Sequence, residues 1–368
     1  MSTESFSYMS VDIKNIFGTR LKLARKLAGL SLQDLAELLE SKVSKQALSK
    51  YELGVMSPTS DVLLSLSQAL HVKPDYFLKR NQIELVNIEF RKRAGLAKKN
   101  EDSIIERARD YVERYLEIEN ILAINNDFIN PLANLDISSD EDVETAAKKL
   151  RDAWNLGNAS IANVVEMLEL KEIKVILIED VDEVDGVAAF TESGIPVIVV
   201  NIKNRSTERI RFTIIHELAH LLLKFAEMIL QDKKRLEELC HYFSSCFLLP
   251  REMLIKMLGG PKRTYVNINE LINIKEHFGI SIRAIVHRAR KINIITDNYY
   301  QRWMVYMSKT YGTKSEPGKY QGNEESNVLE QLVIRALSEG LISTSKAATL
   351  CNVSLGELRK KISSDNQE

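Results

Sequence analysis

The stretch that decides the fold of the central region is Arg211-Phe-Thr-Ile-Ile-His216-Glu217-Leu-Ala-His220-Leu-Leu-Leu223. It is apolar enough to form a buried helix, and in a helix His216 and His220 lie one turn apart on the same face. Two neutral imidazoles at this spacing can take two of the four positions around a zinc ion. Glu217 would then lie beside the open position, where its carboxylate can accept a proton from water. The pattern predicts a zinc peptidase site with Glu217 as the catalytic base.

The alternative interpretation is an ordinary helix with two surface histidines and an unrelated glutamate. Aliphatic residues surround the motif on both sides, namely Ile214, Ile215, Leu218 and Leu221. Burying imidazoles and a carboxylate among them costs free energy unless a metal or a hydrogen-bond network compensates. The apolar surroundings therefore favour the metal site.

A third ligand is needed, and its position distinguishes the types of zinc peptidase. A third histidine six residues after the second would fall on position 226, which is Ala226, so that type is excluded. Residues 233–249 repeat apolar groups at helical spacing and predict a second helix. The candidate ligands on it are Glu237, Glu238, His241 and, more weakly, Cys240. Glu237 and His241 share a stripe beside the apolar face, whereas Glu238 points about 100° away.

Four segments together resemble the ImmA/IrrE metallopeptidase family. They are Gly186-Val-Ala-Ala-Phe190, Pro196-Val-Ile-Val-Val-Asn201, the motif helix that begins at Arg211, and Glu237-Glu-Leu-Cys-His-Tyr-Phe-Ser-Ser-Cys-Phe-Leu-Leu-Pro250. The resemblance implies a Zn²⁺ cofactor held by His216, His220 and the Glu237 carboxylate. Cys240 departs from the usual alanine, and His241 departs from the usual asparagine or aspartate. His241 could orient Glu237, contact substrate, compete as a ligand, or simply pack beside the site.

The N-terminal region carries a second, independent signal. Residues 13–80 contain eleven Lys or Arg and six Asp or Glu, although the whole chain has a net charge of −1. A basic segment within a neutral chain is the electrostatic pattern of a nucleic-acid-binding module. The sequence predicts a bundle of five short helices. Its signals are helix starts at Ser31, at Ser60 or Asp61 and at Pro74, and a helix stop at Gly54.

This bundle resembles the Cro/lambda-repressor-like (XRE) helix-turn-helix family. The matching residues are Ser31-Leu-Gln33-Asp-Leu-Ala36, Val43-Ser44-Lys45-Gln46-Ala-Leu-Ser49-Lys50-Tyr-Glu52, Gly54, Pro58 and Ala69-Leu-His-Val72. The resemblance implies binding to a double-stranded DNA operator. It also implies that the side chains facing DNA are Gln33, Ser44, Lys45, Gln46, Ser49 and Lys50. A small helical bundle with a solvated basic face is the alternative. Gln46 could bond an adenine edge, and Lys45 or Lys50 could reach guanine or phosphate.

The expected fold is mainly α, with an α+β catalytic domain of the zincin-like type. We expect a five-helix helix-turn-helix domain at 1–80, a helical linker at 81–155, the metallopeptidase domain at 156–300, and a hinge with a C-terminal helical module at 301–368. Apolar runs at 174–178 and 196–200 predict two paired strands. The amphipathic segment 104–122 is expected to dock on the catalytic domain.

Residues 312–327 are rich in glycine and charge and predict a loop or hinge. Residues 328–362 have a helix-turn-helix appearance of their own, for which a packing or substrate-gating role is favoured over a second DNA reader. His277 and His287 are expected to be surface or packing residues. The chain lacks a membrane-spanning apolar stretch and a signal-like N-terminus, so we expect a cytoplasmic bacterial protein that joins the nucleoid when it binds its operator. Its three cysteines are an odd count, and we expect their thiols to be reduced.

These patterns predict a DNA-binding transcriptional regulator that carries a zinc endopeptidase. The resemblance implies that the substrate is a partner repressor or antitoxin of a stress, prophage or mobile-element circuit. A homodimer that reads two half-sites is the usual geometry for such DNA-binding domains. The alternative is a regulator without catalysis, in which the zincin fold serves as a sensor or dimerisation domain.

Overall fold

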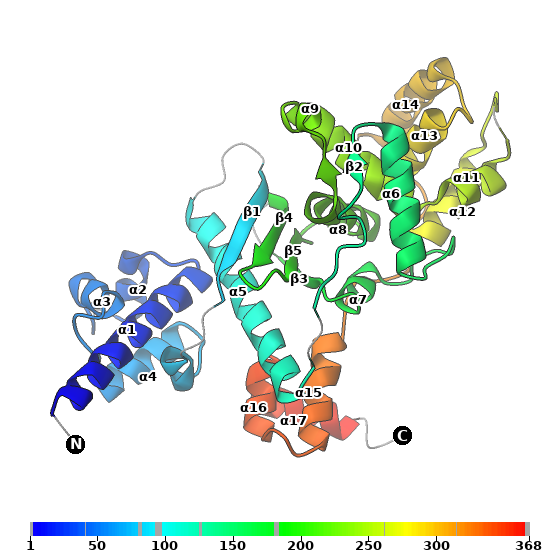
Figure 1. Ribbon diagram of the computed structural model, residues 1–368. Coiled ribbons are helices and arrows are strands. Elements are labelled where there is room, and N and C mark those ends of the chain that lie inside the picture. The colour runs from blue at the N-terminus through cyan, green and yellow to red at the C-terminus, as the bar shows by residue number, and fades with distance from the viewer. Residues whose placement is uncertain are drawn as a thin grey trace. The chain divides into compact units, whose positions relative to one another are not determined.

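Helices make up most of the described part of the chain, and a small four-stranded mixed sheet and a two-stranded sheet lie among them, which confirms the predicted fold class (Figure 1). The computed structural model describes residues 3–40, 42–79, 83–92, 98–124, 127–179, 184–260, 262–313 and 315–364. The chain divides into two units. One comprises residues 1–85 and 92–117, and the other comprises residues 86–91 and 118–368.

The N-terminal unit begins with the predicted five-helix bundle. Its elements are α1 (Thr3–Leu27), α2 (Leu32–Leu38), α3 (Lys45–Glu52), α4 (Ser60–Ala69) and the 3₁₀ helix η1 (Pro74–Leu78). Helices α2, α3 and α4 begin at side-chain caps, because Ser31, Ser44 and Thr59 accept backbone N–H groups of the first turn. The apolar stripes of these helices meet in one core that includes Phe17, Leu21, Leu35, Leu48, Tyr51, Leu66 and Phe77.

Helix α5 (Lys98–Ile121) is divided between the two units, although we expected its whole apolar stripe to dock on the catalytic domain. Residues from Ile118 onward belong to the larger unit, where Glu119 pairs with Lys174 at 2.6 Å, whereas residues up to Glu117 belong to the N-terminal unit. The reason is a set of contacts with α1: the buried Arg20 guanidinium pairs with Glu113 at 2.8 Å, and the Ser103 hydroxyl donates to the Leu27 carbonyl at 3.3 Å. A buried arginine requires a carboxylate partner, and α5 supplies it.

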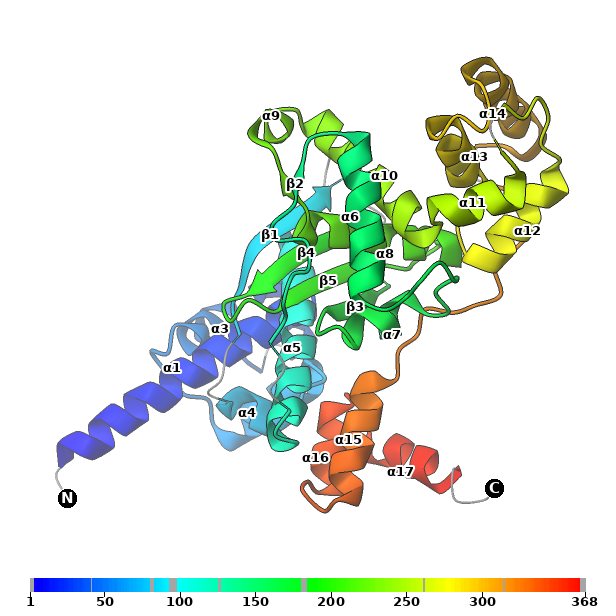
Figure 2. The same ribbon diagram turned by 45° about the vertical axis from the view of Figure 1, so that its right-hand side comes forward.

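The sheet has four strands in the order β1 (Leu85–Lys92), β4 (Val184–Thr191), β5 (Pro196–Asn201) and β3 (Lys174–Ile178) (Figure 2). Strands β3 and β5 pair as predicted, in parallel, with Lys174 opposite Val197. Strand β4 pairs antiparallel with β5. Strand β1 was not predicted, because it lies in the segment interpreted as a helical linker.

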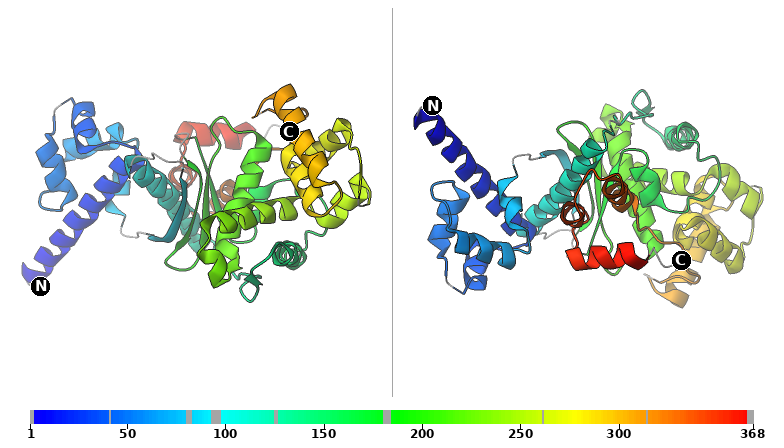
Figure 3. Two further views of the ribbon diagram at one scale, coloured as in Figure 1. Left: turned by 90° about the horizontal axis from the view of Figure 1, so that it is seen from above. Right: turned by 90° about the horizontal axis from the view of Figure 1, so that it is seen from below.

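Helices cover the sheet in successive layers. Helix α8 (Thr207–Leu222) packs on β4 and β5, α10 (Lys233–Leu248) packs on α8, and α6 (Asp140–Ala153) and α13 (Ile282–Lys291) pack on α10 (Figure 3). The remaining elements are β2 (Asp136–Ile137), α7 (Val164–Glu169), β6 (Lys224–Phe225), α9 (Glu227–Leu230), α11 (Arg251–Leu258), α12 (Ile268–Phe278) and α14 (Asp297–Tyr311). None of the helices among the described residues is both long and apolar enough to cross a membrane.

The main core extends beyond the expected limits of the catalytic domain in both directions. On the N-terminal side, α6 was expected in the linker, yet it buries Val143 and Leu150 in this core. On the C-terminal side, Trp303 and Met307 of α14 join the same core. The amphipathic pattern of each helix was visible in the sequence, but a pattern does not identify the surface against which a helix packs.

Residues 315–327 form a loop, as predicted, but it is held to the surrounding helices by buried carboxylates. Glu316 accepts the backbone N–H groups of Ile282 and Arg283 at the start of α13. Glu324 accepts those of Val164 and Val165 at the start of α7. Beyond this loop lie the three helices of the C-terminal module, α15 (Val328–Ser338), α16 (Thr344–Leu350) and α17 (Leu355–Ser364).

Candidate metal centre and DNA-binding face

Helix α8 brings the two motif histidines together inside the larger unit, which comprises residues 86–91 and 118–368. Ser206 caps the helix, and the His216 and Glu217 side chains are buried in its second half. The Nε2 atoms of His216 and His220 are 3.1 Å apart. The helical spacing therefore produces the convergence that the sequence predicted.

The third member of the cluster comes from α10, which crosses α8. The Glu237 carboxylate lies 3.2 Å from His216 Nε2 and 3.4 Å from His220 Nε2. Hydrogen bonds from His216 and His220 hold the pKa of Glu237 well below its ordinary value. Among the described residues, His216, His220 and Glu237 form the one group of three or more His, Cys, Asp or Glu side chains with its ligand atoms within 4.8 Å of one another.

The geometry of this cluster fits a tetrahedral zinc ion. With zinc–nitrogen bonds of about 2.0–2.1 Å, two ligand atoms on a tetrahedron are separated by about 3.3 Å. The two Nε2 atoms are 3.1 Å apart, and each of them lies near a different oxygen of Glu237, at 3.2 Å for Oε2 and 3.4 Å for Oε1, so each separation is close to that value. Two imidazoles and one carboxylate are also a donor set that catalytic zinc sites use, leaving one position for water or substrate.

The buried Glu217 side chain packs closely against a glycine of the sheet. A Cβ atom at Gly186 of β4 would lie 2.5 Å from Glu217 Oε1 and 2.8 Å from Glu217 Cδ. Any side chain at position 186 would therefore collide with the carboxylate. The signal in the sequence was an isolated glycine within a strand pattern, which indicates a close approach by another group.

The other candidate ligands do not join the cluster. Glu238 is half-exposed and pairs with Arg235 at 3.5 Å. The Cys240 thiol lies 4.0 Å from His220 Nδ1, the ring nitrogen on the side away from Glu237, and burial raises the pKa of that thiol. His277 and His287 instead contact the rings of Phe278 and Tyr300.

His241 lies directly beside the cluster, as the sequence suggested. Its Nδ1 atom is 2.7 Å from the Glu237 carbonyl oxygen, so Nδ1 carries the proton and donates it. The ring stacks on Phe212 with centroids 6.0 Å apart, and its centroid is 4.4 Å from that of His216. These contacts fix the orientation of the ring next to two of the candidate ligands.

Arg211, one turn before His216, anchors α8 to distant parts of the chain. Its buried guanidinium donates to the Gly279 carbonyl at 3.1 Å and the Ile161 carbonyl at 2.7 Å, and it forms an ion pair with Glu324. Burial raises the pKa of Glu324, and the Arg211 charge opposes that shift. Nothing in the sequence pointed to Glu324, because its partner is more than a hundred residues away.

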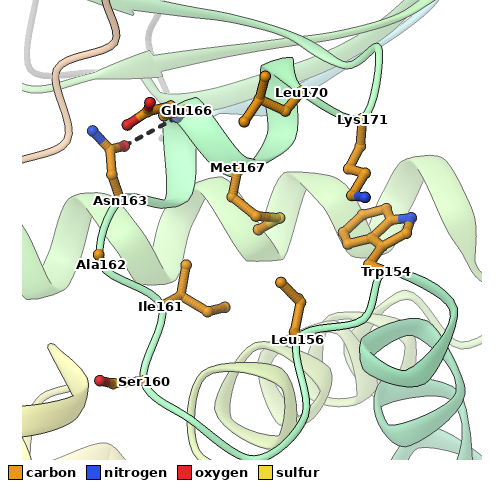
Figure 4. Close-up of a pocket in the computed structure, with 10 residues that line it drawn as sticks. All are labelled: Trp154, Leu156, Ser160, Ile161, Ala162, Asn163, Glu166, Met167, Leu170 and Lys171. Carbon is orange, nitrogen blue, oxygen red and sulfur yellow. Dashed lines mark hydrogen bonds between the residues drawn. The ribbon is translucent and has the colours of Figure 1, made fainter.

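An apolar pocket lies elsewhere in the same unit. It is lined by Trp154, Leu156, Ser160, Ile161, Ala162, Asn163, Glu166, Met167, Leu170 and Lys171 (Figure 4). Neither the clustered histidines nor Glu217 and Glu237 line it. The pocket is therefore separate from the candidate metal centre.

In the N-terminal unit, α3 exposes most of the side chains expected to face DNA. Lys45, Gln46 and Lys50 are exposed, and Ser49 is half-buried. The Ser44 hydroxyl caps the helix by accepting the Ala47 N–H group at 3.2 Å. On α2, the exposed Gln33 amide donates to Glu37 at 2.9 Å.

Helix α3 is fixed in place by an ion pair that the sequence analysis missed. Arg25 of α1 makes two hydrogen bonds with the Glu52 carboxylate, at 2.6 and 2.9 Å. Gly18 lets the two helices approach closely, because a Cβ atom there would lie 2.4 Å from the Tyr51 carbonyl oxygen. The exposed face of α3 is thus carried on a rigid support.

Comparison with known proteins finds one family match for the helix-turn-helix region and another for the region that holds the candidate metal centre. Residues 21–77 match the helix-turn-helix family, and residues 172–290 match the IrrE N-terminal-like domain of the M78 peptidases. The HTH-type transcriptional regulator ImmR of Bacillus subtilis (strain 168) is 31% identical over 110 residues, which cover 30% of this chain and 75% of that relative. The chain belongs to the helix-turn-helix transcriptional regulators.

A second relative from the same organism supports this assignment. The SPbeta prophage-derived uncharacterized HTH-type transcriptional regulator YonR is 39% identical over 64 residues, which cover 17% of this chain and 57% of YonR. The regulator described here therefore combines a DNA-binding helix-turn-helix domain with an IrrE-like domain of metallopeptidase-like fold.

Proposed function

We propose that this regulator is a zinc-dependent endopeptidase. The observation that carries the proposal is the convergence of His216, His220 and Glu237 beside the buried carboxylate of Glu217. The three ligand side chains would hold Zn²⁺, as their donor atoms and separations fit it. A zinc ion bound there supplies the Lewis acidity that activates both water and a peptide carbonyl.

Glu217 performs the proton transfers in this proposal. Its carboxylate accepts a proton from the attacking water and then delivers it to the nitrogen of the leaving amine. The absence of a side chain at Gly186 leaves room for the carboxylate against β4. His241, fixed by the Glu237 carbonyl and by Phe212, orients Glu237 and borders the position of the substrate.

We further propose that the helix-turn-helix domain binds a double-stranded operator as a homodimer. Exposed Lys45, Gln46 and Lys50, with Ser44 and Ser49 beside them and Gln33 on α2, would contact bases and phosphates. The protein substrate would be a repressor or antitoxin of the same regulatory circuit, consistent with the likeness to ImmR and YonR, both described as regulators.

Metal content tests the ligands directly. Wild-type protein purified without chelator should contain about one zinc per chain, and Glu237→Ala should lose most of it. Glu238→Ala is the matched control, since it removes the neighbouring half-exposed carboxylate on the same helix, and it should keep the metal. Wild-type protein without zinc would overturn the metal site and leave a regulator without catalysis.

Cleavage tests the catalytic role. The zinc-loaded protein should cut a helix-turn-helix repressor encoded beside it, and Glu217→Gln should slow cutting by about 10²–10⁴-fold, the usual effect of removing a general base. The variant should retain its zinc, because Glu217 is not among the three clustered ligands. Unchanged cleavage by Glu217→Gln would contradict the assignment.

A further inference from the structure

Strand β4 lies directly beside the catalytic carboxylate. Its residue Gly186 contacts Glu217, and α8 packs on both β4 and β5. One edge of β4 is paired with β5. The other edge is therefore the part of the sheet where a further extended chain could pair next to Glu217.

In this protein that other edge is taken by β1. The strand order is β1-β4-β5-β3, so β1 is the outermost strand beside β4 (Figure 2). The match to the IrrE-like domain covers residues 172–290, which include β3, β4 and β5 but not β1. Within the matched residues, β4 would be an edge strand, and this chain covers that edge with residues 85–92.

An uncovered edge beside Glu217 suits an extended peptide. Peptides commonly bind by adding a strand to an exposed sheet edge, where their backbone groups satisfy the free N–H and C=O groups of that edge. We infer that β1 occupies the position in which the protein substrate pairs with β4, and thereby holds the peptidase closed. This inference rests on the proposed peptidase function, and it adds how the site recognises its substrate and how access to it is controlled.

Two features of β1 suit a strand that can separate from β4. Asn87, the third residue of the strand, has a φ of 52°, in the left-handed region that interrupts regular strand geometry. Residues 86–91 belong to the catalytic unit, whereas the chain on both sides of them belongs to the DNA-binding unit. The strand is thus tethered at both ends to the part of the protein that binds the operator.

A tethered strand competes strongly with a free peptide. Intramolecular segments act at effective concentrations in the millimolar range, so a resident strand lowers the apparent affinity for any peptide that needs the same edge. Weakening the pairing of β1 with β4 should therefore reveal a peptide-binding site whose affinity is barely measurable in the intact protein.

The test uses a fluorescent peptide with the sequence of residues 83–92 and the full-length, zinc-loaded chain carrying Glu217→Gln, so that the probe is not cut. In this background, Ile88→Pro/Glu89→Pro removes two adjacent N–H groups, one of which must face β4 because successive N–H groups alternate in direction. Ile88→Ala/Glu89→Ala is the matched control and retains both groups.

The proline variant should bind the peptide about tenfold more tightly than the alanine variant. Hydrogen exchange at residues 184–191 should be faster in the proline variant and slower again when the peptide is added. Equal affinity in both variants, or no binding by a proline variant that keeps its zinc, would overturn the inference.

Cleavage of casein separates this inference from the proposed function. With Glu217 intact, the proline variant should cut casein faster than the alanine variant. Equal cutting by both variants would contradict the inference and leave the peptidase assignment standing. Peptide binding by the proline variant without cleavage by any variant would instead contradict the peptidase function and support the inference that β1 and a bound peptide compete for the same edge of β4.

Discussion

Helices α3 and α8 carry the two candidate sites of this protein in opposite ways. Helix α3 presents Lys45, Gln46 and Lys50 to solvent and needs the rest of its bundle only as a support. Helix α8 buries His216 and Glu217, and its candidate site is completed by residues from a strand and from another helix. A binding face can therefore be replaced residue by residue, whereas the metal centre depends on contacts between distant segments.

The difference reflects what each function requires. Contact with a nucleic acid needs exposed charge and hydrogen-bonding groups on a rigid surface. A hydrolytic site needs a carboxylate and a metal held in fixed geometry with water partly excluded. Substitutions of buried residues around the candidate metal centre should therefore have large effects, whereas substitutions of exposed residues on the face of α3 should have small effects on stability.

The largest effect is expected from Arg211→Met. It leaves the Glu324 carboxylate buried without its cation and the carbonyls of Ile161 and Gly279 without a donor, so the free energy of unfolding should fall by about 3–5 kcal/mol. Arg335→Met, which breaks the exposed ion pair with Glu339, should change the free energy of unfolding by less than about 1 kcal/mol. Urea unfolding measures both.

The double variant Arg211→Met/Glu324→Gln tests this prediction further, because the new amide oxygen can still accept the N–H groups of Val164 and Val165. It removes both buried charges together and should be less destabilised than Arg211→Met alone, because no uncompensated charge remains. Additive losses in the double variant would show that the ion pair is not the source of the effect.

The second effect concerns the position of the Glu217 carboxylate. Gly186→Ala places a methyl group on Glu217 and should slow peptide cleavage by about 10²-fold, the usual cost of displacing a catalytic group by about 1 Å. Zinc content should be unchanged, because the clustered ligands are not touched. Gly260→Ala is the control, since a Cβ atom there has no neighbour within 4 Å.

The third effect compares the helix caps. Ser44→Ala and Ser206→Ala each remove the hydroxyl that accepts a first-turn N–H group, and each should cost about 1 kcal/mol of unfolding free energy. Ser44→Ala should also weaken operator binding, while Ser206→Ala should leave it unchanged. Equal losses of operator affinity would mean that the two helices are not functionally separate.

The smallest effect on stability is expected from Lys50→Ala, which should leave the unfolding free energy almost unchanged. If Lys50 contacts a phosphate, the slope of log affinity against log salt should become shallower by about 1. Lys256→Ala removes the same charge from an exposed position in the catalytic unit and should leave the slope unchanged. Filter binding at several salt concentrations measures both slopes.

Local patterns in the sequence were sufficient for most of the secondary structure near the two sites. Spacing within one helix predicted that His216 and His220 converge, while the cap residue Ser31 and the helix-starting Pro74 predicted the starts of α2 and η1. The segment 81–155 was harder to predict. Its strand β1 and helix α6 acquire their places only from partners far away in the chain.

The sequence by itself determined the chemistry available to this protein: a pair of histidines with a glutamate on a buried helix, and a basic helix-turn-helix bundle. Only the tertiary structure decided that Gly186 abuts Glu217, that Glu324 neutralises Arg211, and that β1 covers β4. The physical reason is the separation along the chain over which each interaction acts. Helical periodicity and capping act within a few residues, whereas charge pairing, close packing and strand pairing join residues that only the folded chain brings together.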